Sequence, residues 1–365
     1  MTNRKHLTWL DRVMLLLNII SVISLLLAYA STSISPATFW PLAFFGMAYP
    51  LLLAVNFTFV VYWLARKRRF SLFPVIAILL GWGHLNSFVT INSTGKASKN
   101  SNALKVMSYN VRLFDLYNWR DNELTRNEIF DLLLVEDADI MCLQEFFNSP
   151  ERKYFVTKDT IVENFRQQYC HDDYVQKTKH GHEFGIATFS AHPIVNKGRI
   201  DFANDRNNIC IWSDIKIGSD TIRVYNAHLA SIGFQDSDYA LVAELDEDNI
   251  EKGGKRIGQL LKRAFIKRAK QAETIAEHMT DSPYPIIYCA DMNDTPVSYS
   301  YNVLSNELND AFCESATGTG SSYIGDLPSF RIDYIMHSDE LNSYGFKTLP
   351  DELSDHRPIT CFVEW

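Results

Sequence analysis

The chain has no pair of cysteines at CxxC spacing, so a zinc site has little support. Its 365 residues include only six cysteines, at positions 142, 170, 210, 289, 313 and 361. Four of them stand inside apolar, strand-like runs, where a cysteine commonly serves as a small core residue, and these are Cys142, Cys210, Cys289 and Cys361. Disulfide bonds between these cysteines are possible, and their connectivity cannot be read from a sequence.

Positive charge is scarce in the larger part of the chain. The formal net charge is −8, and residues 1–90 carry seven Lys and Arg against Asp11 alone, so residues 91–365 carry −14. Clustered Lys and Arg supply most of the affinity for a polyphosphate backbone, so an acidic region of this size is a poor general binder of nucleic acid. A small phosphate site around a divalent cation is still compatible, because the ion supplies the positive charge.

Charged residues are absent between positions 13 and 65, a run far longer than the ~20 apolar residues that cross a bilayer once. The polar stretch STSISPAT divides this run, so we expect transmembrane helices near residues 13–30 and 39–64. A third apolar stretch, residues 70–89, contains one proline, two glycines and a histidine, but it has no charge. The start of the chain is therefore predicted to be a membrane anchor with about three transmembrane helices.

Cations flank the predicted helices on one side only. Arg4, Lys5 and Arg12 precede the first helix and RKRR at 66–69 precedes the third, whereas the loop between the first two helices has none. By the positive-inside rule these cations face the cytoplasm. Three crossings then make residues 1–90 the anchor of an integral protein of the cell (inner) membrane, with the rest of the chain on the extracytoplasmic side. If the third stretch is only a buried or interfacial hairpin, the rest is cytoplasmic instead.

A cleaved signal peptide is the rival interpretation of the first helix. The sequence AYA at residues 28–30 has the small-x-small form of a cleavage site and follows a basic start. The apolar segment is long for such a signal, however, and a second apolar segment follows it at once. A membrane anchor is therefore the preferred interpretation.

Short apolar runs alternate with helical patterns after residue 103. Residues 91–103 are small and polar, which is typical of a linker. The apolar runs that follow are typical of buried strands, while apolar residues spaced by three and four predict helices over 125–137 and 254–279. The cations of the second helix form its solvated face or, alternatively, guide an anionic substrate. The alternation predicts one α/β domain over residues 104–365.

Most strand-like runs of this domain end in a polar residue that can bind a metal or move a proton. Rigid strands hold such side chains precisely while the loops give access, so this is where α/β folds build their sites. Asp333 is the hardest to explain otherwise, because an aspartate inside the apolar run RIDYI needs a partner. The candidates are Asn110, Glu145, His228, Asp291, Asn293, Asp333, Asp355 and His356.

Seven short motifs follow one another in this domain, namely SYNVR, CLQE, FGIATFSAHPI, NAHLAS, CADMND, RIDYI and SDHRPI. In these motifs and their order, residues 104–365 resemble the endonuclease/exonuclease/phosphatase family of metal-dependent phosphoesterases. The resemblance implies an α/β (α+β) four-layer sandwich, in which two packed mixed β-sheets are flanked by helices. It also implies hydrolysis of a phosphoester by in-line attack of water on phosphorus.

The resemblance assigns metal and water chemistry to five candidates. Glu145 resembles the main Mg²⁺ ligand of the family, with Asn110 beside it and Asp355 contributing, and Mn²⁺ is the other metal to consider. Asp291 resembles the residue that orients or deprotonates the attacking water. Asn293, two residues along and so expected on the same strand face, resembles the amide that holds the phosphoryl oxygens.

The resemblance also assigns roles to two histidines. His356 resembles the histidine beside the scissile phosphate, with Asp333 as the carboxylate that fixes its tautomer and favours imidazolium. His228 resembles a second phosphate-binding histidine and a candidate general acid. Glu183, just before FGIA, is expected to pair with His228.

Two positions depart from the family pattern. Arg112 follows the pair Asn110-Val111, unlike the apurinic endonucleases, and this weakens a role in DNA repair. Ser190-Ala191 stands where Ser-Arg is usual, which is a minor loss.

The sequence thus predicts a membrane-anchored, Mg²⁺-dependent phosphoesterase. Its substrate is a phosphodiester, cleaved in a nuclease-like or sphingomyelinase-like reaction, or a phosphomonoester. The expected partners are the lipid bilayer and a phosphoester in a lipid headgroup, a nucleic acid or a small molecule, and no protein partner is inferred. The alternative is a catalytically inactive, membrane-tethered binding or scaffold module on the same fold, but such a module should have lost site residues, and all the candidates are present.

Overall fold

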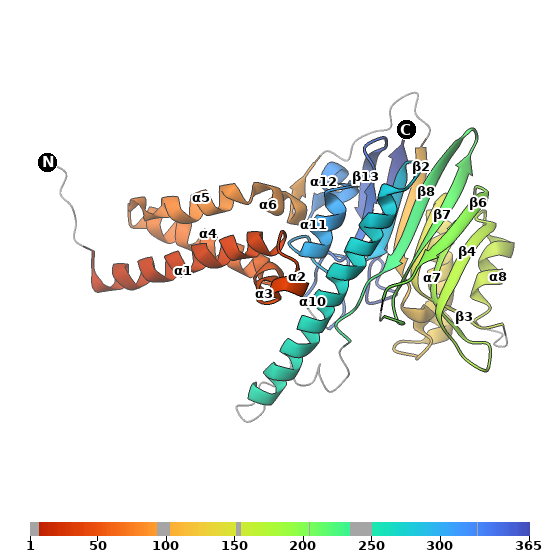
Figure 1. Cartoon of the computed structure of the whole chain (residues 1–365), viewed down its shortest axis with the longest axis horizontal. Coiled ribbons are helices and arrows are strands. Elements are labelled where there is room, and N and C mark those ends of the chain that lie inside the picture. Colours follow the sequence, from red (N-terminus) through yellow and green to blue (C-terminus); the bar gives the residue numbers. More distant parts are fainter. Residues whose placement is uncertain (1–6, 93–102, 151–154, 204, 234–249, 327) are drawn as a thin grey trace.

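The protein has two parts, a bundle of apolar helices and a β-sandwich, which lie side by side in Figure 1. This computed structural model describes residues 7–92, 103–150, 155–203, 205–233, 250–326 and 328–365.

The helical bundle begins with α1 (Trp9–Ser31), whose first turn is closed by a capping box between Thr8 and Asp11. Its 23 residues are about 34 Å long, enough to cross the hydrocarbon core of a bilayer. The other elements are α2 (Pro36–Phe39), α3 (Pro41–Met47), α4 (Tyr49–Ala65), η1 (Arg69–Ser71), α5 (Leu72–Leu80) and α6 (Trp82–Phe88).

The second and third predicted transmembrane helices are each broken in the structure. The bend between α3 and α4 is 65°, and the bend between the segment η1–α5 and α6 is 66°. Gly81 ends α5, and Pro50 lies in the first turn of α4, where a missing N–H costs nothing. By length and composition, α1 alone is fit to span a membrane, or up to three spans exist among the described residues if each bent pair is one. Three transmembrane helices are therefore not confirmed.

The sandwich consists of two six-stranded sheets. The first has the order β10-β12-β9-β8-β7-β6, with bounds Asn309–Asp310, Asp333–His337, Ile286–Asp291, Asp220–His228, Ile209–Ile217 and Ile194–Ile200. The second has the order β13-β14-β2-β3-β5-β4, with bounds Asn342–Thr348, Ile359–Glu364, Ala103–Asn110, Ile140–Asn148, Glu183–Ser190 and Tyr169–Lys177. The pairs β2/β3 and β8/β9 are parallel and the other pairs antiparallel, so both sheets are mixed, as the sequence predicts.

Helices cover the outer faces of both sheets, which gives four layers (Figure 1). The sheets pack on each other through small and branched side chains such as Val106, Val224 and Ile287, together with Cys142 and Cys289. The second sheet is covered by α7 (Asn122–Glu136) and α8 (Thr157–Asn164), and the first by α10 (Ile250–Thr280) and α11 (Tyr299–Ser305). Both predicted helices are present as α7 and α10, and all six cysteines are free.

Side chains and backbone of the two parts interlock where they meet. Val297 of the sandwich is buried in a cluster with Leu25, Ala28 and Tyr49 of the bundle. The guanidinium of Arg331 donates a 2.8 Å hydrogen bond to the carbonyl of Ser87. Further along, β1 (Thr90–Ile91) pairs with β11 (Thr317–Gly318), beside α12 (Ala311–Ser315). Most of the predicted linker, residues 93–102, lies outside the described residues.

Candidate active site

Four strand ends bring the candidate residues to one end of the sandwich. Asn110 ends β2 and His228 ends β8, while Asp291 ends β9. In the ladder His228 is the partner of Asp291, and Asp291 is in turn the partner of Asp333 at the start of β12. Because β8 and β9 are parallel, both deliver their last side chains to the same edge, and the antiparallel β12 starts there.

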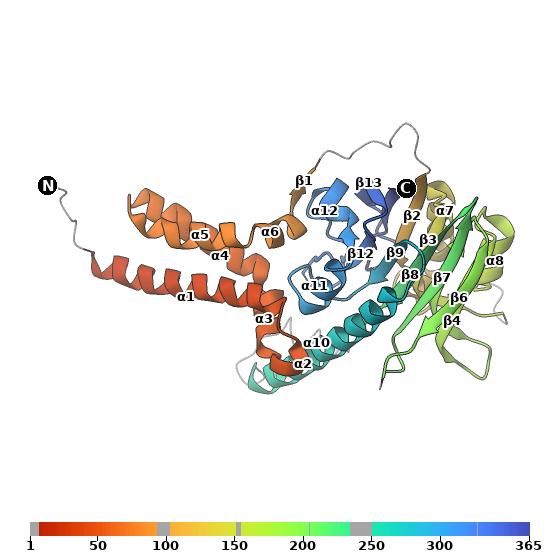
Figure 2. The same cartoon turned by 45° about the horizontal axis from the view of Figure 1, so that its top comes forward.

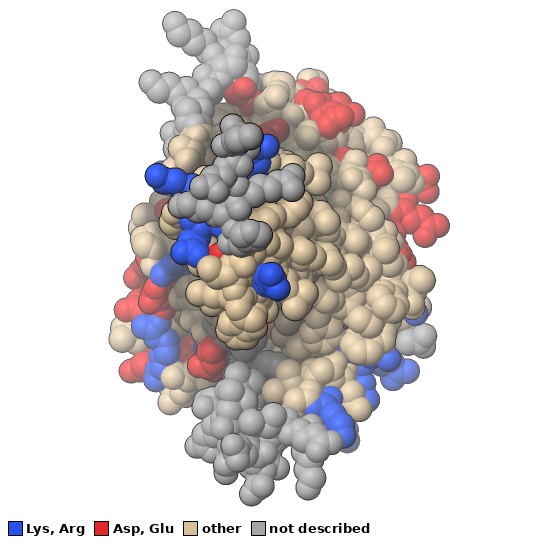
Figure 3. All heavy atoms as spheres, turned by 90° about the vertical axis from the view of Figure 1, so that its left-hand side faces the viewer, with Lys and Arg blue, Asp and Glu red and all other residues tan. Residues whose placement is uncertain are grey.

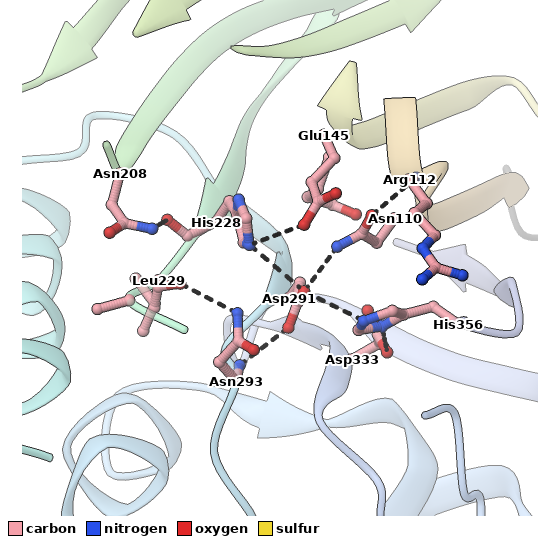
Figure 4. A network of polar contacts seen from close by, with 12 residues as sticks. Asn110, Arg112, Glu145, Asn208, His228, Leu229, Asp291, Asn293, Asp333 and His356 are labelled. Atoms are coloured by element: carbon pink, nitrogen blue, oxygen red, sulfur yellow. Dashed lines mark hydrogen bonds and ion pairs between the residues drawn. The ribbon is translucent and has the colours of Figure 1, made fainter. Parts of the chain in front are cut away.

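Asp291 lies at the centre of this group (Figure 4). Its Oδ2 accepts a 2.9 Å hydrogen bond from Asn110 Nδ2, and its Oδ1 accepts one of 2.9 Å from the backbone N–H of Asn293. The same Oδ2 lies 3.6 Å from His228 Nε2 and 3.7 Å from His356 Nε2. A buried carboxylate is thus held in place by two donors and faces an imidazole on each side.

His356 and Asp333 form a buried pair, with Nδ1 and Oδ2 2.8 Å apart. Ser322 fixes the backbone beneath the pair, because its hydroxyl accepts from the N–H groups of Ile332 and Asp333. Burial alone would lower the pKa of His356, but the charges of Asp333 and Asp291 outweigh it and hold that pKa well above its usual value. Burial also raises the pKa of Asp333. Nδ1 of His356 is thus engaged by Asp333, and its Nε2 lies on the side of Asp291.

A β-bulge places Glu145. The register of β3 against β5 shifts between Leu143 and Phe146, and Glu145 has a φ of +47°. Its Oε1 lies 3.8 Å from His228 Nε2, which is buried and has no hydrogen-bond partner among the described residues. The surrounding protein raises the pKa of Glu145 by desolvation, and the charge of His228 opposes this rise. Glu145 and His228 thus face each other at a distance beyond that of a hydrogen bond.

Asp355 lies beside the guanidinium group of Arg112. Its Oδ2 lies 3.4 Å from Arg112 Nε, and the neighbouring Ser354 hydroxyl donates to the carbonyl of Asn110. Arg112 opens η2 (Arg112–Asp115), in which four successive residues have φ between 44° and 58°. Such left-handed backbone is costly for residues other than glycine, and the carboxylate of Asp115 supports it by accepting from two N–H groups further along the chain. Arg112, the position that departs from the apurinic endonucleases, is thus part of the site edge.

Two expectations drawn from the sequence are not met. Asn293 does not share a strand face with Asp291, because β9 ends at Asp291 and Asn293 lies in a left-handed turn with φ of +50°. That turn still brings it to the site, where its amide donates to the carbonyl of Leu229. Glu183 does not pair with His228, because its carboxylate accepts instead from Asn148 and Lys177.

Polar side chains that the sequence reasoning passed over tie the two sheets together behind the site. Gln144 donates to the hydroxyl of Ser108 at 3.1 Å and to Asn226 Oδ1 at 2.9 Å, and Asn226 Nδ2 donates to the carbonyl of Ala187 at 3.0 Å. A signal was available, because Gln144 and Asn226 belong to the motifs CLQE and NAHLAS. Both are fully buried, and a buried amide needs such partners.

The donor set fits a divalent cation that prefers oxygen. Four carboxylates face this end of the sandwich, from Glu145, Asp291, Asp333 and Asp355, with the amide of Asn110 among them. Ligand atoms of Asp291, Asp333 and His356 lie within 4.8 Å of one another. Asp333 Oδ1 is buried and has no hydrogen-bond partner among the described residues. An oxygen-rich, acidic site of this kind suits Mg²⁺ or Mn²⁺ better than a soft metal.

Comparisons with known proteins agree with this geometry. A family model described as a domain of unknown function matches residues 11–88, and the model of the Endonuclease/Exonuclease/phosphatase family matches residues 107–356. No curated protein matches the chain.

Three similar solved structures are an endonuclease/exonuclease/phosphatase family protein from Bacteroides thetaiotaomicron, a mannosyl-6-phosphatase from the same organism and a humanized D. rerio TDP2. Their identities to this chain are 18%, 18% and 14%, and their TM-scores are 0.52, 0.51 and 0.51. The matches cover 73%, 71% and 72% of this chain and 97%, 99% and 98% of those chains. At such identities the likeness speaks for the fold, and the family match over more than half of the sequence decides membership: the chain belongs to the endonuclease/exonuclease/phosphatase family.

Proposed function

We propose that the chain is a membrane-anchored, divalent-metal-dependent phosphoesterase. The observation that carries this proposal is Asp291, a buried carboxylate held by Asn110 and placed less than 4 Å from the imidazoles of His228 and His356. A carboxylate flanked by two imidazoles can take a proton from water while the imidazoles donate to phosphoryl oxygens. The family relatives include a mannosyl-6-phosphatase, so both phosphomonoesters and phosphodiesters are within the proposal.

The proposed reaction is hydrolysis by in-line attack. Asp291 accepts a proton from the water whose oxygen forms the new bond to phosphorus, and the ester P–O bond on the opposite side breaks. His356, kept protonated by Asp333, donates from Nε2 to a phosphoryl oxygen as charge grows there. In this proposal His228 supplies a proton to the leaving oxygen. Asn293 orients Asp291 through its backbone N–H.

A divalent cation would be held by Glu145, with Asn110 and Asp355 beside it, and when bound it would neutralise charge on the phosphoryl oxygens. Mg²⁺ is the proposed ion, with Mn²⁺ as the other candidate. Glu145 is one-third exposed, so a ligand position there is open to solvent and substrate. The acidic surface of the domain speaks against a general nuclease, because nucleic acid binding relies on clustered cations.

The proposed anchor places the catalytic domain outside the cytoplasm. Arg66, the first residue of RKRR, pairs with Asp11 in the first turn of α1 at 2.9 Å, so this basic segment lies at the N-terminal end of α1. The sandwich packs against the opposite end of the bundle (Figure 2). If the bundle spans the inner membrane, this arrangement and the positive-inside rule together support an extracytoplasmic domain. A reporter that works only outside the cytoplasm should be active when it is fused after Trp365. Activity of a reporter that works only in the cytoplasm would show the opposite orientation.

The catalytic proposal is tested on the full chain in detergent with bis(p-nitrophenyl) phosphate and p-nitrophenyl phosphate. Activity should need Mg²⁺ or Mn²⁺ and should be lost with a chelator. Asp291→Asn and His356→Ala should each lower kcat/KM by about 10²–10⁴-fold, the usual contribution of a positioned acid or base. His192→Ala, in the loop before β6, is the matched control and should keep wild-type activity. Wild-type rates in His356→Ala would overturn the assignment, and absence of any turnover would favour the inactive scaffold.

A further inference from the structure

We propose that the substrate is an amphiphile taken from the bilayer, whose phosphoester meets Asp291 and His356 while its hydrocarbon part lies in an apolar groove leading from the site to the membrane helices. The inference rests on the proposed function, because it names the substrate class of that same site.

The groove and the catalytic residues share one cavity of about 490 Å³. This volume falls in the range of about 300–1,000 Å³ that is typical of small-molecule sites. At one end the cavity is lined by Glu145, Asp291, Asn293, Asp355 and His356. The remaining lining is mainly apolar, and we define the apolar groove by Met47, Ile257, Leu261, Phe265, Phe330 and Ile332. A phosphate alone would use the first set and leave the second unexplained.

The helix α10 gives the groove its direction. Arg268, which also lines the cavity, pairs with Asp294 just after the catalytic residues of β9. From there Phe265, Leu261 and Ile257 follow at steps of four toward the start of α10, so they form one stripe on the helix. The eleven steps from position 268 to position 257 span about 16 Å along the helix axis. The stripe therefore leads away from the phosphoester position over a distance that suits an alkyl chain.

The bundle builds part of the groove wall. Met47, the last residue of α3, lines the cavity although it lies in the apolar segment predicted to enter the membrane. Phe44 of the same helix packs edge-to-face on Phe265, with ring centroids 5.3 Å apart. Figures 1 and 2 both show α10 passing beside α2 and α3, at the end of the bundle nearest the sandwich. A substrate that leaves the bilayer there enters the groove directly.

The surroundings of the groove have the chemistry of a membrane interface. Trp40, partly exposed at the start of α3, carries the ammonium of Lys262 over its ring at 4.9 Å. Trp82 is 62% exposed at the same end of the bundle, and interfacial tryptophans are common at the headgroup level. Arg263 is exposed on α10 next to Lys262, where it can attract an anionic headgroup. Figure 3, which looks at the bundle from the end away from the sandwich, shows a broad surface of uncharged residues with charged residues of both signs around it.

The test is a chain-length series on the full chain in one detergent at fixed concentration. Two sets of probes, alkyl p-nitrophenyl phosphates and alkyl monophosphates with methyl, butyl, hexyl and octyl chains, cover diesters and monoesters. Burial of a methylene is worth about 0.8 kcal/mol, which corresponds to about fourfold in affinity. Because the groove is partly open, kcat/KM should rise about two- to fourfold for each added methylene, mainly through KM.

Two groove variants separate binding by the groove from partition into micelles. Ile257→Ser and Phe330→Ser change half-buried side chains outside the catalytic group. Each should flatten the chain-length slope and leave the methyl substrate at the wild-type rate. Leu134→Ser, on the exposed face of α7 over the other sheet, is the matched control and should keep the wild-type slope. Partition into the detergent is common to all proteins and cancels in the ratio of variant to wild type.

The outcomes distinguish this inference from the function on which it rests. Chelator-sensitive hydrolysis of the methyl substrate without a chain-length slope, or with the same slope in both groove variants, would overturn the inference and leave the phosphoesterase standing. No hydrolysis of any probe would overturn both. A slope that is lost in Ile257→Ser and Phe330→Ser and kept in Leu134→Ser supports the amphiphilic substrate.

Discussion

The bundle and the sandwich differ in which side chains they expose and which they bury. Of the 32 large apolar side chains that are exposed among the described residues, 24 lie between residues 9 and 91. The same region also buries polar side chains, and Asp11, Asn18 and Asn56 have no solvent-accessible surface. The sandwich keeps its apolar side chains between the sheets and under the helices. This inversion is the pattern expected of the proposed membrane anchor joined to a water-facing domain.

The boundary between these regions is a packed interface as well as a change of composition. Val297 enters the apolar cluster of the bundle, and Arg331 reaches across to Ser87. Two parts with opposite solvation are thus held in one orientation, and this orientation brings Met47 into the lining of the cavity that contains the candidate site. The interface can be broken or tested at defined residues.

Arg331→Met should have the largest effect on stability. The guanidinium is buried, lies 2.8 Å from the carboxylate of Asp310 and donates to Ser87 O. Removing one partner of a buried ion pair leaves an uncompensated charge and costs about 3–5 kcal/mol. Thermal unfolding of the full chain in detergent measures the loss. The double variant Arg331→Met/Asp310→Asn should recover part of it, and Lys177→Met, which removes an exposed pair with Glu183, should change it by about 1 kcal/mol or less. An unchanged melting temperature in Arg331→Met would show that the junction contributes nothing.

Gly46→Ala should open the same junction with a smaller effect. A Cβ at this position would collide with the hydroxyl of Ser31 and with the carbonyl of Val297, and the backbone atom cannot move aside. Overpacking of this kind typically costs about 1–3 kcal/mol. Gly83→Ala is the matched control, because a Cβ there meets nothing within 4 Å. The control should be neutral or slightly stabilising. Equal melting temperatures of the two variants would contradict a tight junction.

The local pattern predicts the strands and their polar ends, because side-chain period and polar termination are local properties, whereas the two-sheet sandwich comes from the resemblance to the family. Asp333 inside RIDYI signals a buried partner, and the structure supplies His356 at 2.8 Å. The bulge at Glu145 and the turn at Asn293 are not local in this sense, because one extra residue or one left-handed residue depends on how neighbouring strands pack. The predicted pairing of Glu183 with His228 is wrong for the same reason. The positions of β3 and β4 determine which residues contact Glu183, and the motif that follows Glu183 does not.

The anchor is predicted in composition but not in shape. Hydropathy finds the apolar segments, whereas the breaks near residues 48 and 81 arise where helices end against neighbours. The docking of the bundle on the sandwich is also invisible in the sequence, because Val297 and Arg331 are ordinary apolar and basic residues until the fold brings them to the bundle. The substrate groove follows from this docking.

Asn226→Leu should loosen the two sheets behind the site. The amide joins Gln144 to the carbonyl of Ala187, and its loss removes one buried acceptor of Gln144, which keeps Ser108, and the donor to the carbonyl of Ala187. The expected cost is about 1–3 kcal/mol in the free energy of unfolding. Because Gln144 precedes Glu145, kcat should also fall, whereas KM for a short substrate should change little. Asn196→Leu, at the exposed side of β6, is the control and should leave kcat unchanged.

The smallest expected effect is pH-dependent and belongs to the sandwich alone. His337 Nε2 lies 2.8 Å from the carboxylate of Glu314. Burial alone would lower the pKa of His337, but the hydrogen bond to Glu314 raises this pKa above 6.5. Burial alone would raise the pKa of Glu314, but the hydrogen bonds to His337 and Ser343 lower this pKa below 4.5. The raised pKa of His337 means that this group stabilises the fold below pH 6.5, and the stabilisation is lost as the pH rises through the pKa of the folded state. The lowered pKa of Glu314 means that this group stabilises the fold only above pH 4.5.

The pair therefore contributes most between about pH 4.5 and 6.5. Because Glu314 is about one-third exposed, solvent screening limits the contribution to about 1 kcal/mol or less. His337→Gln should lower the melting temperature more at pH 6 than at pH 9, and His180→Gln, exposed in the turn before β5, should lower it at neither pH. An equal loss at both pH values would mean that His337 acts through packing, and a pH dependence confined to variants of the bundle would reverse the division of roles between the two regions.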